Sequence, residues 1–161
     1  MTANERETAS PEQTEALGAA LGRTAPGGGL LGLIGELGTG KTCLVRGLAR
    51  GLDADSGAVH SPSFVVATEY PGGRLPLTHV DLYRLGEMTA DDPFLRELLF
   101  GRGVAAVEWM DRLGPGPTEE CLLVTLHYLS SERRAVRFEA HGPLHEQWLT
   151  AALSLAARSG G

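Results

Sequence analysis

One short segment constrains the fold of this chain more than any other feature. Residues 35–42 read Gly-Glu-Leu-Gly-Thr-Gly-Lys-Thr and satisfy the pattern G-x-x-x-x-G-K-[ST]. An apolar run from Leu30 to Ile34 precedes the segment, and Leu44, Val45 and Leu48 follow it with the spacing of one helix face. A strand, a glycine-rich turn and a helix in this order predict an α/β fold whose turn binds phosphate.

The residue types of this segment suit a nucleoside triphosphate with Mg²⁺. Glycines let backbone N–H groups approach phosphate oxygens, and the helix N-terminus adds a favourable dipole. Lys41, the only lysine of the chain, is expected to reach the β- and γ-phosphates as a catalytic residue, and the Thr42 hydroxyl is expected to bind the metal. The predicted nucleotide-binding residues here are Gly35, Gly38, Thr39, Gly40, Lys41, Thr42 and Cys43.

A phosphate-binding loop of this kind needs a carboxylate at the end of a neighbouring strand, which holds Mg²⁺ directly or through water. Two segments supply a candidate. Residues 104–107 are all apolar and are followed by Glu108, whereas residues 77–80 are more polar and are followed by Asp81. Because interior parallel strands are apolar throughout, we assign Glu108 to the metal.

The rest of the pattern predicts one domain over residues 1–161, with residues 1–9 and 158–161 as flexible tails. We expect a P-loop NTPase-like, three-layer α/β fold with a mixed, mostly parallel central sheet, flanking helices and antiparallel hairpins. Helices are predicted at about 10–23, 41–51, 91–100 and 144–157, and further strands at about 64–70, 75–81, 122–129 and 135–140.

Composition and charge exclude several classes of protein. A formal net charge of -6 disfavours independent binding to DNA or RNA, and no stretch approaches the roughly 20 apolar residues of a membrane-spanning helix. The first ten residues are polar and unlike a secretory signal, so we expect a cytoplasmic protein. Cys43 and Cys121 lie far apart and are expected to remain reduced thiols.

Several motifs occur together in an order more specific than the glycine-rich segment alone. They are Gln13-Thr14, GELGTGKT, SPSF at 61–64, HVDLYRL at 79–85 and VEW at 107–109. On these motifs nearly the whole chain resembles the bacterial tRNA threonylcarbamoyladenosine biosynthesis ATPase family, called TsaE or YjeE.

The resemblance implies an ATPase that is weak alone, with ATP in the glycine-rich loop and Mg²⁺ held by Thr42 and Glu108. It implies that Asp81 contributes to hydrolysis as a water-orienting, basic or outer-shell metal group. It also suggests nucleotide contacts by Thr14 and by Arg134, which fits the pattern better than Arg133. The implied partners are TsaB- and TsaD-like proteins, with tRNA bound mainly through their complex.

Three other classes of function share parts of this pattern. Asp111 to Gly114 matches the D-x-x-G switch of small GTPases, but guanine recognition by N-K-x-D is impossible because the only lysine is Lys41 and the only asparagine is Asn4. A small-metabolite kinase uses the same phosphate cradle. A nucleotide-gated binding module without turnover shares every binding residue, and only measured turnover separates it from an ATPase.

Overall fold

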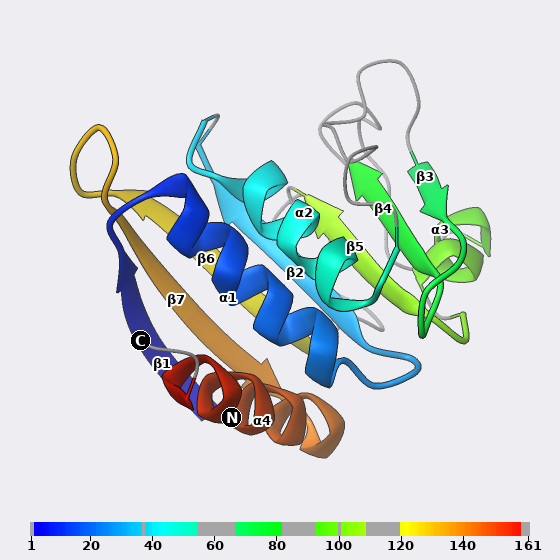
Figure 1. The fold of residues 1–161 in the computed structure, drawn as a ribbon. Helices are drawn as coiled ribbons and strands as arrows, with labels where there is room; N and C mark the ends of the chain where they lie inside the picture. The colour runs from blue at the N-terminus through cyan, green and yellow to red at the C-terminus, as the bar shows by residue number, and fades with distance from the viewer. Residues whose placement is uncertain are drawn as a thin grey trace.

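The computed structural model describes residues 2–36, 38–54, 67–81, 93–99, 101–108 and 120–158 (Figure 1). Strands and helices follow one another along the chain in nearly the predicted order. The elements are β1 (Thr2–Thr8), α1 (Pro11–Thr24), β2 (Leu30–Gly35), α2 (Lys41–Gly51), β3 (Ala67–Tyr70), β4 (Leu77–Asp81), α3 (Pro93–Leu99), β5 (Val104–Glu108), β6 (Cys121–Tyr128), β7 (Arg134–His141) and α4 (Pro143–Arg158).

The described strands form one mixed sheet in the order β1-β7-β6-β2-β5-β4-β3. The central pairings, β6 with β2, β2 with β5 and β5 with β4, are parallel. The outer pairings, β1 with β7, β7 with β6 and β4 with β3, are antiparallel. The predicted α/β class is confirmed, and the parallel strands occupy the centre of the sheet, where β2 leads into the glycine-rich segment.

Two apolar clusters lie on opposite faces of this sheet. On one face, Leu31 and Leu33 of β2 pack in the same cluster as Leu44 and Leu48 of α2. Figure 1 shows α1, α2 and α4 in front of this face. On the other face, alternate residues of the same strands, such as Leu30, form a second cluster with Leu99 of α3. Buried strands therefore read as apolar runs because both of their faces are covered.

Helices α1 and α2 pack unusually closely, because glycines of each helix lie against the backbone of the other. A Cβ added at Gly47 of α2 would lie 1.9 Å from the carbonyl oxygen of Glu15, and one added at Gly18 of α1 would lie 2.1 Å from that of Leu44. The close contact fixes α2, and with it the start of that helix, against the rest of the domain.

The N-terminal segment is where the sequence prediction was wrong. Residues 2–8 form strand β1 and pair with β7 from Thr2↔Ala140 to Thr8↔Arg134, so they are not a flexible tail. An edge strand is held by backbone hydrogen bonds along one side, so it needs few apolar side chains and gives little hydrophobic signal. At the other end, helix α4 reaches Arg158, and residues 159–161 lie outside the described part of the chain.

Helices in the described part of the chain are all too short or too polar to cross a membrane.

Candidate nucleotide-binding site

The glycine-rich loop connects the end of β2 to the start of α2 through two left-handed glycines. Gly38 has φ 79° and Gly40 has φ 108°, a region that residues with a side chain rarely adopt. A Cβ at Gly38 would also lie 2.7 Å from the Tyr128 hydroxyl. Glycine is therefore required at both positions, and the chain can turn sharply into the helix. Leu37 lies outside the described residues.

The N-terminus of α2 lacks the side-chain cap that α1 possesses. In α1, the Ser10 hydroxyl accepts a hydrogen bond from the Gln13 N–H at 3.2 Å and so caps the helix. In α2, the capping residue is Gly40, which offers no side-chain acceptor. The first amides of α2, including those of Thr42 and Cys43, have no partner within the helix, so this end suits an anion.

Lys41 lies inside the loop rather than in solvent. Its side chain is buried, and its Nζ donates hydrogen bonds to the carbonyl oxygens of Gly35 and, at 3.0 Å, Glu36. The Thr39 hydroxyl donates to the same Glu36 carbonyl at 2.7 Å. The only lysine ammonium group of the chain is thereby held against the backbone of the loop.

The two candidate carboxylates lie side by side next to this loop. The parallel register pairs Asp81 of β4 with Glu108 of β5, and Glu108 in turn with Leu33 of β2. Both carboxylates are buried, at 6% and 3% exposure. The carboxyl ends of parallel strands lie at the same end of a sheet. Glu108, the assigned metal ligand, therefore ends β5, the strand next to β2, and Asp81 ends β4, the strand after that.

His79 is a member of this group that the sequence analysis did not predict. Its Nε2 lies 2.6 Å from Oε2 of Glu108, and both side chains are buried, the histidine completely. A carboxylate that binds a metal is ionised and has no hydrogen to donate, so in that role of Glu108 the His79 Nε2 is the donor of this hydrogen bond. The available signal was a polar residue two positions before Asp81, which strand alternation places on the same face of the sheet.

Thr14 and Arg134 flank the loop on the side away from the carboxylates. Thr14 is buried at the start of α1, with its methyl group 3.5 Å from a Cβ built at Gly40. Arg134 donates from Nε to the Thr39 carbonyl at 3.1 Å, and its guanidinium lies 4.4 Å from the centroid of the Tyr128 ring.

Neighbouring Arg133 is turned away and pairs with the exposed carboxylate of Glu7. The structure thus places Arg134, and not Arg133, at the loop. Its contact with a nucleotide stays a prediction, as does that of Thr14.

The oxygen donors present fit Mg²⁺ bound together with a nucleotide. Within the described ranges, no three histidine, cysteine, aspartate or glutamate side chains form a ready metal cluster. Mg²⁺ does not need one, because it usually takes one or two protein oxygens and completes its shell with phosphates and water. Half-buried Thr42 in the first turn of α2 and Glu108 at the end of β5 supply oxygens of the required kind.

Several predicted features lie outside the described residues. They are the SPSF segment at 61–64, residues 82–85 of the HVDLYRL motif, Trp109, and the segment 111–114.

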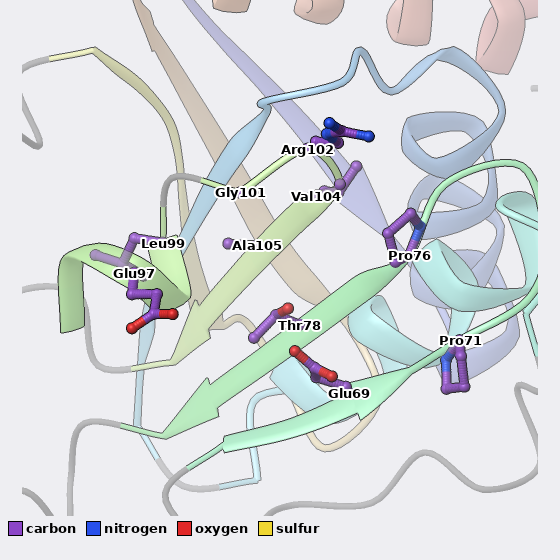
Figure 2. Close-up of a pocket in the computed structure, with 11 residues that line it drawn as sticks. Glu69, Pro71, Pro76, Thr78, Glu97, Leu99, Gly101, Arg102, Val104 and Ala105 are labelled. Atoms are coloured by element: carbon purple, nitrogen blue, oxygen red, sulfur yellow. The ribbon is translucent and has the colours of Figure 1, made fainter. Parts of the chain in front are cut away.

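A pocket on the other face of the sheet is separate from this site. Figure 2 shows it beside β3, β4 and α3, where Glu69, Thr78 and Glu97 are among the residues that line it. Thr78 alternates along β4 with His79, which faces the candidate site. The sheet therefore separates this pocket from the nucleotide loop.

The match to a family model decides the relationship of this chain. The model described as "Threonylcarbamoyl adenosine biosynthesis protein TsaE" matches residues 8–136. The chain belongs to the TsaE family. Every predicted site residue, from Thr14 to Arg134, falls within the matched range.

Individual TsaE proteins and a solved structure agree with this assignment. The chain is 36% identical over 139 residues to a Bacillus subtilis protein named tRNA threonylcarbamoyladenosine biosynthesis protein TsaE, covering 86% of this chain and 87% of that one. It is 37% identical to the protein of that name from Streptomyces coelicolor, covering 88% and 97%. The crystal structure of Bacillus subtilis YdiB superposes with a TM-score of 0.75 at 29% identity, covering 99% and 97%. The expected family and fold are confirmed.

Proposed function

We propose that this protein is the Mg²⁺-dependent ATP-binding and ATP-hydrolysing subunit of the machinery that forms N6-threonylcarbamoyladenosine in tRNA. One observation carries the proposal: an uncapped helix N-terminus and a buried lysine follow β2, and two buried carboxylates end the neighbouring parallel strands β5 and β4. Cationic groups for a triphosphate and anionic groups for its metal are thus adjacent. Membership of the TsaE family indicates that the pathway is threonylcarbamoyladenosine biosynthesis.

Each residue of the site has a distinct role in this proposal. Amides at the start of α2 and the ammonium group of Lys41 bind the phosphates, while Thr42 and Glu108 hold Mg²⁺. When bound, the metal neutralises charge on the phosphate oxygens. Asp81 lies one strand further and would orient the attacking water, accept its proton or act as an outer-shell group of the metal.

The partners follow from the family and from the charge of the chain. A formal net charge of -6 gives little general attraction for a phosphate backbone. We therefore propose that TsaB- and TsaD-like proteins bind most of the tRNA, and that ATP binding and hydrolysis drive or reset the assembly. In this proposal the isolated chain is a weak ATPase, and it acts in the cytoplasm.

Substitutions at the site test the proposed ATPase activity. We expect Thr42→Ala, Asp81→Asn and Glu108→Gln each to lower the ATP hydrolysis rate by about 100-fold or more, because each removes an oxygen ligand or a charge at the reaction centre. Phosphate release would be measured at saturating ATP and Mg²⁺, and each fold checked by circular dichroism. Unchanged hydrolysis in all three variants would contradict the site, and no turnover in the wild-type chain with its partners present would favour a nucleotide-gated binding module.

Reconstitution tests the proposed pathway. The full chain would be mixed with TsaB- and TsaD-like proteins, tRNA and threonylcarbamoyl-adenylate, with ATP or without it. We expect modified adenosine to accumulate over repeated turnovers only when the chain and ATP are both present. Equal yields without the chain would contradict its role.

A further inference from the structure

The contact between His79 and Glu108 has no role in the site as built above. The two side chains come from neighbouring parallel strands, and the register places His79 opposite Ala106, two residues before Glu108. Their hydrogen bond is therefore a diagonal contact across the strand pair, with 2.6 Å between Nε2 and Oε2. It fixes one carboxylate oxygen of Glu108 and leaves Oε1 as the oxygen available to a metal.

Burial makes this contact a poor source of folding stability. The histidine is fully buried, and its second nitrogen, Nδ1, makes no hydrogen bond with any described residue. A buried polar atom without a partner costs free energy, and a pair of apolar side chains of similar volume is often at least as stable as a buried polar pair. Packing alone thus gives no reason for a histidine here.

We propose that His79 is a positioning residue that holds the Glu108 carboxylate in the orientation needed to bind Mg²⁺. This inference rests on the proposed function, in which Glu108 is a metal ligand. The carboxylate of a glutamate can rotate about its side-chain bonds. A hydrogen bond from His79 to one of its oxygens restricts this rotation even when no metal is bound. Groups that orient metal ligands in this way typically contribute 10- to 100-fold to metal affinity.

Metal binding, measured apart from turnover, tests this role. Mn²⁺ would be titrated into the full chain with a non-hydrolysable ATP analogue, and free Mn²⁺ followed by electron paramagnetic resonance. We expect His79→Leu to raise the Mn²⁺ dissociation constant about 10- to 100-fold. His79→Gln keeps a side-chain N–H donor and is expected to stay within about threefold of wild type, since the hydrogen bond is what matters.

Two controls separate positioning from a general structural effect. Affinity for the analogue in EDTA is expected to be equal in all variants, because the phosphate loop is untouched. In a Glu108→Gln background, His79→Leu is expected to have no further effect on Mn²⁺ binding, because the group it orients is already changed.

Three results would overturn the role of His79. They are wild-type Mn²⁺ affinity in His79→Leu, equal losses in the leucine and glutamine variants, or an undiminished effect in the Glu108→Gln background. If His79→Leu does not fold, His79→Asn replaces it, since its shorter amide does not reach Glu108, and equal Mn²⁺ affinity in the asparagine and glutamine variants would overturn the proposal. Failure of the wild-type chain to bind Mn²⁺ with the nucleotide would instead contradict the proposed function itself.

Discussion

Two adjacent arginines at the start of β7 have different surroundings, one at the glycine-rich loop and one on the surface. Arg134 donates to the Thr39 carbonyl and covers the Tyr128 ring, so it braces the loop from outside. Arg133 forms an ion pair with Glu7, and both side chains are about half exposed. Exposed ion pairs contribute little free energy, whereas a planar guanidinium can hydrogen-bond and stack at once.

Replacing each arginine by lysine measures this difference. We expect Arg134→Lys to weaken binding of a non-hydrolysable ATP analogue about tenfold, or ~1.4 kcal/mol, because an ammonium cannot both reach the carbonyl and stack on the ring. Arg133→Lys is the matched control and is expected to change affinity by less than about twofold. Isothermal titration calorimetry would measure both, and equal effects would show that Arg134 does not organise the loop.

At the scale of elements, α2 is positioned by backbone contact with α1 rather than by large side chains. The Cβ of an alanine at position 47 would meet the carbonyl oxygen and carbon of Glu15 and the Ala19 nitrogen within 3 Å. Backbone atoms in the middle of α1 cannot move aside without shifting the whole helix, so the clash would instead displace α2, whose first amides are the proposed phosphate-binding groups.

The variant Gly47→Ala tests this close packing, because two effects oppose each other. Helix propensity favours alanine by roughly 1 kcal/mol, but the clash with α1 is expected to exceed this gain and to lower the free energy of unfolding by about 1–3 kcal/mol. Gly101→Ala is the control, since a Cβ there meets nothing within 4 Å, and it is expected to stay within about 0.5 kcal/mol. Urea unfolding measures both, and a stabilised Gly47→Ala would refute the close approach.

The same elements show which features a single sequence can predict. The segment from Leu30 to Gly51 was predicted almost residue by residue, because apolar spacing and the glycine pattern agree there. Glu108 was predicted from the apolar run before it, and the structure places it beside the loop strand. Strand β1 was missed because its stability comes from backbone pairing, and His79 was missed because its partner lies 29 residues away on another strand.

At the scale of the whole molecule, two buried hydrogen bonds hold α4 against the sheet and against α1. The Trp148 indole N–H donates to the Leu21 carbonyl at 2.9 Å, and His145 Nε2 accepts a hydrogen bond from the Leu30 N–H at 3.1 Å. The second contact requires a neutral imidazole, because a protonated ring has no lone pair to accept the bond. It also lies at the start of β2, the strand that leads to the glycine-rich loop.

The free energy of unfolding therefore depends on pH through the protonation of His145. Burial lowers the pKa of His145 below its usual value near 6.5, with Glu120 opposing part of the effect. Between the lowered pKa and about 6.5 the unfolded chain binds more protons than the folded one, so the free energy of unfolding rises with pH in this window. The contribution is fully present above pH 6.5 and is lost as the pH falls through the folded-state pKa.

A non-titrating acceptor at the same position isolates this contribution. Urea unfolding of the wild-type chain from pH 7.5 to 5 is expected to show a slope of up to about 1.4 kcal/mol per pH unit from this one group. The amide oxygen of His145→Gln still accepts a hydrogen bond but does not titrate, so the variant is expected to show a shallower slope below pH 6.5. Carboxylates that titrate near pH 5 contribute equally to both proteins and cancel in the difference. Identical pH profiles would mean that protonated His145 is tolerated in the fold and that α4 does not depend on the bond to Leu30.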